Sequence, residues 1–272
     1  MGPFCFPPPA PVSVMNASGQ LYADLAGYYD GFCRHVDYGE EARFMQRLFA
    51  AFAGDRRDAH APPDYLDLAC GTGQHLLRMQ AQGFAGTGLD NSAAMLAAAA
   101  RRCPGAEFIH ADIAALAADS AFDLISCFLY SMHYNHPPPV FDEAVRRAYR
   151  ALRPGGLFVF DLVDCRGLGA LRTHVTQLRQ DGADFTFSSG WSYPGTGETM
   201  TLQVAIRREA DGVVQQWTDA HTMTATSIAA TCATLAAAGF EVLVLERDFD
   251  RLREWQGASH NVILVGSKPL PA

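Results

Sequence analysis

The sequence predicts a doubly wound α/β fold, with a mostly parallel sheet of seven strands and a small antiparallel β insertion after the fifth strand. Strand-like and helix-like segments alternate from residue 65 to residue 163, and such alternation implies a parallel sheet with right-handed crossovers. Segments rich in Thr, Phe, Val and Trp follow at 164–222 with no helical pattern between them. A helical segment and two strand-like segments then close the chain.

Composition limits the class of protein. The chain has 272 residues, of which 49% are apolar and 18% charged, which indicates a folded core rather than disorder. The net charge of −8 disfavours nucleic acid and anionic membranes as partners. Seven scattered cysteines without a C-x-x-C pair favour a reducing, cytoplasmic setting with no disulfide framework and no metal site. Lys268 is the single lysine, which argues against Schiff-base chemistry and a P-loop.

The N-terminal part is expected to differ from the rest. Residues 1–18 are rich in proline and lack periodicity, so we expect a disordered tail. Residues 19–54 predict two helices, the second with an apolar stripe that favours a place in the core. Residues 54–64 form a polar linker.

The central part contains the alternating segments. We expect strands at 64–68, 84–89, 106–110, 122–128 and 156–163, and helices at 73–82, 92–102 and 139–152. Pro154, Gly155 and Gly156 should end the last of these helices.

The C-terminal part should first form the insertion and then return to the main sheet. Stretches 184–189, 198–208 and 213–222 predict antiparallel strands, separated by the turn pairs Pro194-Gly195 and Asp211-Gly212. A helix at 226–238, capped by Gly239, and strands at 240–247 and 261–267 complete the fold. We therefore expect one domain built from 19–163 and 223–272, with the insertion at 164–222 covering an acceptor site or forming a dimer contact.

The chain is organised around residues 65–75, Tyr-Leu-Asp-Leu-Ala-Cys-Gly-Thr-Gly-Gln-His. This stretch predicts a buried strand, a glycine loop and a helix. Gly71 and Gly73 permit a tight turn and a close approach of a ligand to the backbone, and the helix N-terminus attracts an anionic group. Asp90 follows the next strand, where a carboxylate can bind two ribose hydroxyls. The stretch is therefore typical of a nucleotide-like cofactor site.

Two cofactor classes use such a loop. A dinucleotide site requires a third glycine, where this chain has Leu76. The observed pattern, Asp67-x-Ala69-x-Gly71-x-Gly73, resembles the first motif of class I S-adenosylmethionine (SAM) methyltransferases, with Ala69 in place of the usual first glycine.

Four further motifs follow in the same order as in that family. Residues 88–92 (Gly-Leu-Asp-Asn-Ser) resemble the second motif and residues 111–113 (Ala-Asp-Ile) the third. Residues 122–126 (Phe-Asp-Leu-Ile-Ser) resemble the fourth, and residues 152–156 (Leu-Arg-Pro-Gly-Gly) resemble the turn before the fifth strand.

The resemblance implies a role for each candidate cofactor residue at the carboxyl ends of the strands. The backbone of the glycine loop would hold the methionine end of SAM, and Asp67 would order the loop or contact the cofactor directly. Asp90 would bind the ribose. The other candidates would frame the adenine or line the floor of the site: Ala69, Gly71, Gly73, Gln74, Asn91, Met95, Asp112, Ile113 and Phe128.

A narrower resemblance begins upstream. Residues 28–30 (Tyr-Tyr-Asp) and 37–42 (Asp-Tyr-Gly-Glu-Glu-Ala) resemble the bacterial aminosugar N,N-dimethyltransferases of macrolide pathways and related small-molecule N-methyltransferases. The resemblance implies that Tyr29 and Tyr38 contact SAM. It places Tyr22 and His133 nearest the substrate amine. The histidine is displaced by one residue from the family position, so Tyr134 or His136 could replace it, and the spacing from Tyr29 to Tyr38 is shorter.

These observations predict an enzyme that transfers a methyl group from SAM to a nitrogen, or an oxygen, of a small molecule, in bacterial secondary metabolism. His133 would act as base or orienter, unless it is a satisfied core histidine; Tyr22 and Tyr134 complete the candidate catalytic set. The alternatives are a protein that binds SAM without turnover and an NAD-dependent oxidoreductase. We expect a monomer or homodimer.

Overall fold

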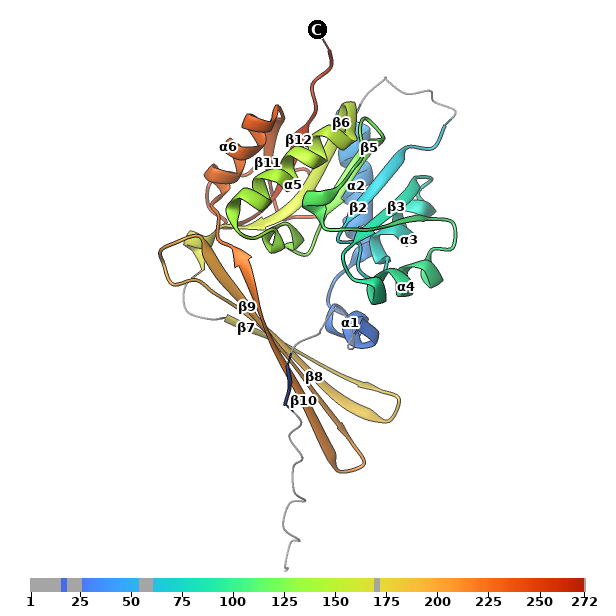
Figure 1. Cartoon of the computed structure of the whole chain (residues 1–272), viewed down its shortest axis with the longest axis vertical. Coiled ribbons are helices and arrows are strands. Elements are labelled where there is room, and N and C mark those ends of the chain that lie inside the picture. Colours follow the sequence, from blue (N-terminus) through green and yellow to red (C-terminus); the bar gives the residue numbers. More distant parts are fainter. Residues whose placement is uncertain (1–15, 19–25, 54–60, 169–171, 272) are drawn as a thin grey trace, which may run out of the picture.

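The computed structural model of the chain describes residues 16–18, 26–53, 61–168 and 172–271, and contains two β-sheets (Figure 1). The helices are α1 (Ala26–Phe32), α2 (Tyr38–Phe52), α3 (Gln74–Ala81), α4 (Ala93–Arg102), α5 (Pro138–Ala151) and α6 (Ile228–Ala238), with short 3₁₀ turns η1 (Ile113–Ala115), η2 (Ser131–Tyr134) and η3 (Cys165–Gly167).

The larger sheet has seven strands in the order β11-β12-β6-β5-β2-β3-β4. Its strands are β2 (Asp64–Leu68), β3 (Ala85–Asp90), β4 (Glu107–His110), β5 (Phe122–Cys127), β6 (Leu152–Val163), β11 (Glu241–Glu246) and β12 (Asn261–Ser267). Strands β2 to β6 pair in parallel, and β12 pairs antiparallel with β6 and with β11. The predicted doubly wound α/β class is confirmed.

Each face of this sheet has its own apolar core. Alternate residues of a strand point to opposite faces, so Leu66 and Leu68 of β2 pack with α5 and α6, whereas Tyr65 packs with α2, α3 and α4. The apolar stripe predicted for the second N-terminal helix is buried through Phe44, Met45 and Leu48. The carboxyl ends of β2 to β5 therefore share one open edge between the two helical layers.

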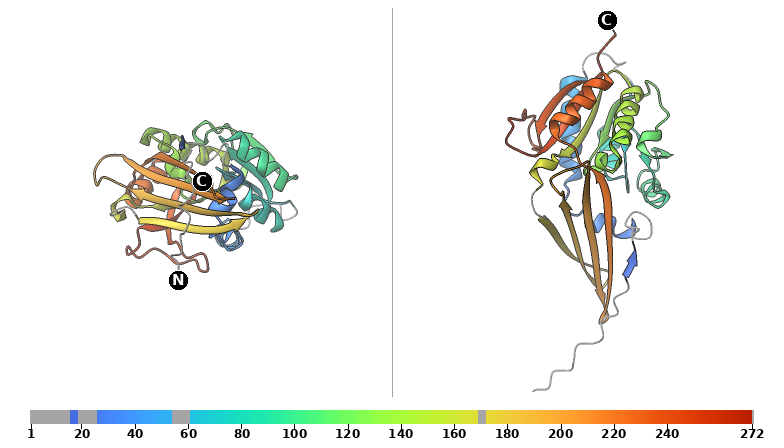
Figure 2. Two further views of the ribbon diagram at one scale, coloured as in Figure 1. Left: turned by 90° about the horizontal axis from the view of Figure 1, so that it is seen from below. Right: turned by 60° about the vertical axis from the view of Figure 1, so that its left-hand side comes forward.

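The second sheet is the predicted insertion, and it projects away from the main sheet (Figures 1 and 2). Its order is β1-β10-β9-β8-β7, in which the four strands β7 (Arg172–Gln180), β8 (Ala183–Ser192), β9 (Thr199–Ala210) and β10 (Val213–Thr224) pair antiparallel with one another. Helix α1 covers one face of it through Tyr28 and Phe32.

Two parts of the second sheet differ from the expectation. The strand β7 was not predicted, because its residues are mostly polar and only Val175 and Leu178 are large apolar side chains. The tail expected to be disordered over 1–18 includes β1 (Asn16–Ser18), which pairs in parallel with Gln216–Thr218 of β10. The remainder of that tail lies outside the described residues.

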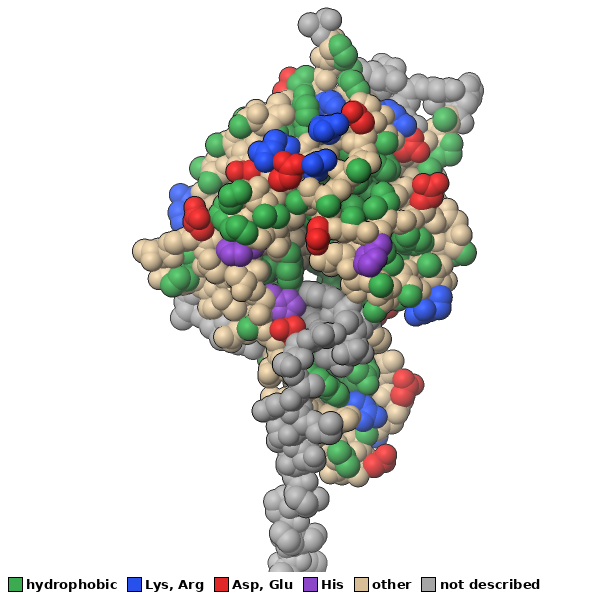
Figure 3. Space-filling view, viewed as in Figure 1, with side chains coloured by type: hydrophobic (Ala, Val, Ile, Leu, Met, Phe, Trp, Pro, Cys, Tyr) green, Lys and Arg blue, Asp and Glu red, His purple; other side chains and the backbone are tan. Residues whose placement is uncertain are grey.

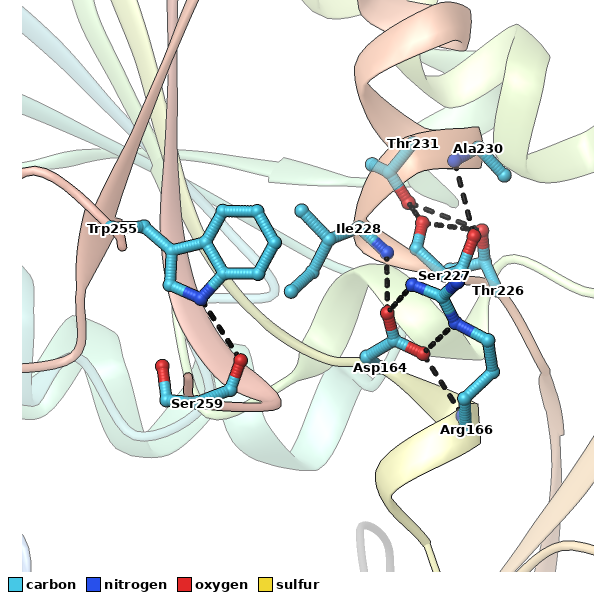
Figure 4. Close-up of polar contacts among 9 residues, drawn as sticks. All are labelled: Asp164, Arg166, Thr226, Ser227, Ile228, Ala230, Thr231, Trp255 and Ser259. Carbon is cyan, nitrogen blue, oxygen red and sulfur yellow. Dashed lines mark hydrogen bonds and ion pairs between the residues drawn. The ribbon is translucent and has the colours of Figure 1, made fainter. Parts of the chain in front are cut away.

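The two ends of the insertion are tied together at the main domain (Figure 4). The Asp164 carboxylate accepts hydrogen bonds from the Ile228 amide at 3.1 Å and from the Arg166 amide at 2.9 Å, and it pairs with the Arg166 guanidinium at 2.6 Å. Ser227 caps α6 by accepting from the Ala230 amide. Because Asp164 is fully buried, this junction fixes where the second sheet leaves and rejoins the main domain.

The surface is mixed in charge. On the face shown in Figure 3, acidic and basic side chains are interspersed over the main domain. No helix in the described ranges is long and apolar enough to cross a membrane.

Candidate functional site

A cavity of about 270 Å³ opens at the carboxyl ends of the parallel strands, where ligands bind in open α/β sheets. It is closed from the other side by α1 and by strand β10 of the inserted sheet. Its lining comprises Tyr29, Ala69, Gly71, Leu89, Asp90, Asn91, Met95, Ala111, Asp112, Ile113, Leu129, Ser131, Tyr134, Asn135 and His221.

The loop after β2 has a left-handed backbone at three alternate residues. Ala69, Gly71 and Gly73 have φ of 55°, 54° and 80°, a conformation that favours glycine. A Cβ at Gly73 would lie 3.1 Å from Cβ of Ala99, so this part of the loop rests on α4 and does not line the cavity. Gly71 instead lines the cavity beside the Tyr29 ring, where an added Cβ would lie 3.6 Å from Cε1 of Tyr29.

Asp90 holds the loop from the neighbouring strand. Its Oδ2 accepts a hydrogen bond from the Gly71 amide at 2.8 Å, and its Oδ1 accepts from the Ser92 amide at 2.8 Å. Burial raises the pKa of this carboxyl. The cap of α4 is Ser92, whose Oγ accepts from the Met95 amide. Asp90 is thus not needed as a helix cap, and each of its oxygens has a further lone pair for a ligand hydroxyl.

The next part of the cavity is an apolar slot with a polar rim. Met95 and Ile113 are almost fully buried and line it. On the rim, the Asn91 amide donates to Oδ1 of Asp112 at 2.9 Å. A flat ring with exocyclic donors would fit between these groups.

A second, smaller hollow of about 20 Å³ adjoins the cavity on the other side of the glycine loop, with Tyr38, Asp67, Gln74 and Phe128 among its lining residues. Asp67 is 1% exposed. Its Oδ1 accepts from the Ser126 hydroxyl at 3.0 Å, whereas its buried Oδ2 makes no hydrogen bond within the described part of the chain. Burial raises the pKa of Asp67 to about 6. A buried acceptor with no partner fits a cationic ligand group, which would supply the missing bond.

The wall of this hollow is held by a buried ion pair. Nε2 of His75 lies 2.7 Å from Oε2 of Glu41, and the Tyr38 ring packs edge-on against the His75 ring at 4.9 Å. Burial lowers the pKa of His75, but Glu41 and Asp67 raise it overall. Helix α2 is thereby fixed to the start of α3, with Tyr38 beside the loop.

The expectation that His133 faces a substrate is wrong. His133 is fully buried and does not line the cavity. Its Nδ1 donates to the Thr224 carbonyl at 2.9 Å, and its Nε2 accepts from the Val163 amide at 3.3 Å. Burial lowers the pKa of this ring to about 4. Both nitrogens are therefore engaged by the backbone, and the neutral ring joins η2 to the base of the inserted sheet.

The neighbouring residues and the inserted sheet form the far end of the cavity. Ser131, Tyr134 and Asn135, in and just after η2, line it, as does His221 of β10. The Tyr134 and His221 rings lie 5.4 Å apart and nearly perpendicular. Tyr22 lies outside the described residues. Nothing in the sequence pattern of β10 singled out His221, because both faces of this strand mix polar and apolar residues.

Three comparisons bear on this site. Residues 66–156 match the family model described as a methyltransferase domain, and this range contains the ends of β2, β3, β4 and β5 that line the cavity. Residues 66–156 therefore form a methyltransferase domain.

Among curated relatives, the chain is 35% identical over 140 residues to the dTDP-4-amino-2,3,4,6-tetradeoxy-D-glucose N,N-dimethyltransferase of Saccharopolyspora spinosa, covering 51% of this chain and 54% of that protein. It is 38% identical over 140 residues to the trans-aconitate 2-methyltransferase of Paracidovorax citrulli, covering 46% and 52%. The matches thus span about half the length of each of these two relatives.

Among solved structures, the chain resembles DesVI of Streptomyces venezuelae with a TM-score of 0.74 and 26% identity, over 92% of this chain and 99% of that one. The likeness therefore extends beyond the matched domain to the inserted sheet.

Proposed function

We propose that this methyltransferase transfers a methyl group from SAM to a nitrogen of a small-molecule acceptor. One observation carries the proposal. The two adjoining cavities are lined by an aspartate from each of three successive strand ends, Asp67, Asp90 and Asp112. In this order along the edge of the sheet, they would face the ammonium group, the ribose and the adenine of SAM. When bound, SAM supplies an electrophilic methyl group on a sulfonium sulfur.

Each end of the cofactor has a suitable partner. The orphaned Oδ2 of Asp67 would accept from the ammonium group, and the left-handed backbone at Gly71 would admit the methionine chain. Asp90 would accept from both ribose hydroxyls, since it already fixes the loop that carries the methionine end. Asp112 would accept from the adenine amino group.

The aromatic rings near the loop suit a sulfonium. Tyr29 lines both cavities and lies against Gly71, and Phe128 lines the smaller one. The face of an aromatic ring attracts a cation by about 0.5–2 kcal/mol, more when water is excluded. These rings would orient the methyl group toward the far end of the cavity, where the acceptor enters.

A nitrogen acceptor is favoured over a carboxylate or a phosphorylated group by charge. In the part of the chain that the structure describes, three aspartates line the cavities and no Lys or Arg does. Residues 1–15 and 19–25, which the structure does not describe, also contain no Lys or Arg. An electronegative pocket attracts a protonated amine and repels an anion. The name of the Saccharopolyspora spinosa relative, an N,N-dimethyltransferase, also gives a nitrogen acceptor, although the sugar in that name carries a dTDP group.

We assign the inserted sheet to the roof of the acceptor site. It contributes His221 to the cavity, and α1 lies between this sheet and the glycine loop. Excluding water at this point protects the methyl donor and strengthens the electrostatic contacts inside.

The test is calorimetric titration of the purified protein with SAM and, separately, with NAD. We expect micromolar binding of SAM and none of NAD, because Leu76 fills the space against β3 that a third glycine would leave open. A mixture of free amines is then assayed for methylation by mass. Binding of NAD without SAM would contradict the cofactor assignment, and binding of SAM without any methylated product would favour a protein that holds SAM without turnover.

A further inference from the structure

The smaller hollow beside the glycine loop is lined by groups of both charges. Asp67 contributes a carboxylate whose buried Oδ2 has no partner in the described part of the chain. His75, the second residue of α3, contributes an imidazole to the same hollow. Among the described residues that line the two cavities, only His75 and His221 can carry a positive charge, and His221 lines the larger cavity alone. His75 is therefore the candidate cation of the smaller hollow.

Glu41 fixes the orientation of this ring. Its Oε2 lies 2.7 Å from Nε2 of His75, and both side chains are almost fully buried. The rings of Tyr38 and Phe128 pack against the imidazole, with centroids 4.9 and 5.4 Å away. The other ring nitrogen, Nδ1, makes no hydrogen bond to any residue that the structure describes. Because Glu41 holds Nε2, Nδ1 is the ring nitrogen left for a ligand.

The surrounding carboxylates favour the charged form of His75. Burial lowers the pKa of the ring, but the hydrogen bond to Glu41 and the charges of Asp67 and Asp161 raise it, so that the pKa lies above its usual value. The free amides in the first turn of α3 add to the positive potential, because Gly73 offers no side chain to cap them.

Two other polar side chains belong to the same network. Arg247 lies 3.5 Å from Oε1 of Glu41 and 3.3 Å from Oδ2 of Asp161, and it does not line the hollow. The hydroxyl of Tyr38 stays protonated at neutral pH, because burial raises its pKa. Arg247 therefore balances the carboxylates from behind, and the positive side-chain charge inside the hollow comes from the imidazole.

We propose that the imidazolium of His75, oriented by Glu41, binds the carboxylate at the methionine end of SAM. This inference rests on the proposed function and names the partner of one group of the cofactor. The methionine end is a zwitterion, with an ammonium and a carboxylate on the same carbon. Asp67 suits the ammonium, and a buried carboxylate without its own partner is costly. The Nδ1–H of His75 would supply that partner through a charge-assisted hydrogen bond.

The first experiment separates the carboxylate from the rest of the cofactor. SAM, decarboxylated SAM and 5′-methylthioadenosine, which lacks both the ammonium and the carboxylate, are titrated calorimetrically into wild type, His75→Gln and the control His174→Gln, an exposed histidine on β7. Glutamine can still donate to Glu41, but it has no charge and no donor in place of Nδ1. In His75→Gln we expect the affinity for SAM to fall roughly 10- to 100-fold, because a charged hydrogen bond is lost. The affinities for the other two ligands, and all three in the control, should be unchanged.

The pH dependence tests the charge of the ring and the positioning role of Glu41. Comparing wild type with His75→Gln at each pH cancels the titration of SAM itself, and above about pH 7 Asp67 and Asp161, whose pKa values are about 6, are mostly ionised. The advantage of wild type in SAM affinity should shrink between about pH 7 and pH 9, as His75 loses its proton. In Glu41→Gln, which keeps an acceptor but removes its charge, this loss should begin at a lower pH. A purely structural role of Glu41 would not move the profile.

A second readout uses wild type alone and so does not depend on the folding of any variant. In protein labelled with ¹⁵N-histidine, NMR titration should show that SAM raises the pKa of His75 and that decarboxylated SAM does not, because a bound carboxylate favours the charged ring.

The outcomes distinguish this inference from the proposed function. A His75 pKa that SAM leaves unchanged would overturn the inference alone. So would equal losses of affinity for SAM and decarboxylated SAM in His75→Gln, since they would mark a structural residue. A wild-type protein that does not bind SAM would overturn the proposed function and this inference with it.

Discussion

The Gly71 amide donates to Oδ2 of Asp90 at 2.8 Å, so the same carboxylate that would bind the ribose also holds the glycine loop. The contact joins the ends of adjacent strands β2 and β3, which pair in parallel up to Leu68 and Leu89. Binding of the ribose and order in the loop are therefore coupled through one side chain.

The first prediction concerns this side chain. Asp90→Ala should weaken SAM binding about 100-fold in calorimetric titration, because two hydrogen bonds to a charged group contribute about 3 kcal/mol together. Asp112→Ala, at the exposed rim of the adenine slot, should weaken it only a fewfold. Equal losses in the two variants would contradict the coupling.

The second prediction concerns Ala69, whose φ of 55° is a left-handed conformation in a non-glycine residue. That conformation costs an L-residue about 1–2 kcal/mol, whereas glycine costs about 0.5–1 kcal/mol in lost entropy. Ala69→Gly should therefore raise the free energy of unfolding by about 0.5–1 kcal/mol in urea titration.

The matched control for this prediction is Ala97→Gly, at an exposed position inside α4. The same substitution there should lower the free energy of unfolding by about 1 kcal/mol. A loss in both variants would show that the loop is not strained at Ala69.

The strand ends of the site could be predicted from the sequence because topology places them. Once the alternation of strands and helices is recognised, the carboxyl ends of parallel strands must share one edge. Asp67, Asp90 and Asp112 follow three such strands and line the cavities. Leu76, which stands where a dinucleotide site has its third glycine, also indicated the cofactor class. Its side chain packs against Gly86 and Gly88 of β3, so the small residues of this helix–strand contact lie on the strand and not on the helix.

The acceptor end could not be predicted in the same way. Whether His133 or His221 faces the cavity depends on how the inserted sheet docks, which is decided by backbone contacts at Val163 and Thr224. These partners lie far from His133 in sequence and belong to different sheets. Strand β7 was missed for a related reason, because its residues are stabilised by pairing with β8 rather than by an apolar pattern.

The third prediction concerns the acceptor's charge. Free aminosugars should have a kcat/KM at least tenfold above the same sugars linked to a nucleoside diphosphate, because the described residues that line the cavities include no Lys or Arg to neutralise the phosphates. The KM for the free amine should rise with ionic strength, since salt screens its attraction to the aspartates. Equal use of the nucleotide-linked sugar would contradict this electrostatic account.

The fourth prediction follows from the burial of His133, which lowers its pKa from 6.5 to about 4. The unfolded chain takes up this proton as the pH falls below about 6.5, whereas the folded chain resists until about 4. Stability contributed by the neutral ring is thus complete above pH 6.5 and is lost as the pH falls toward 4. Wild type should lose about 2–3 kcal/mol more than His133→Gln between about pH 7.5 and pH 4.5.

Urea unfolding at several pH values measures this difference, with the exposed His174→Gln as control. The comparison with a variant is required because Asp67 and Asp161, whose pKa values burial raises to about 6, act in the opposite direction. In His133→Gln, the rate of methyl transfer per folded molecule should stay within a fewfold of wild type, since the ring does not line the cavity. A stability difference that does not change with pH would mean that His133 is accessible to protons in the fold, contrary to its two backbone contacts.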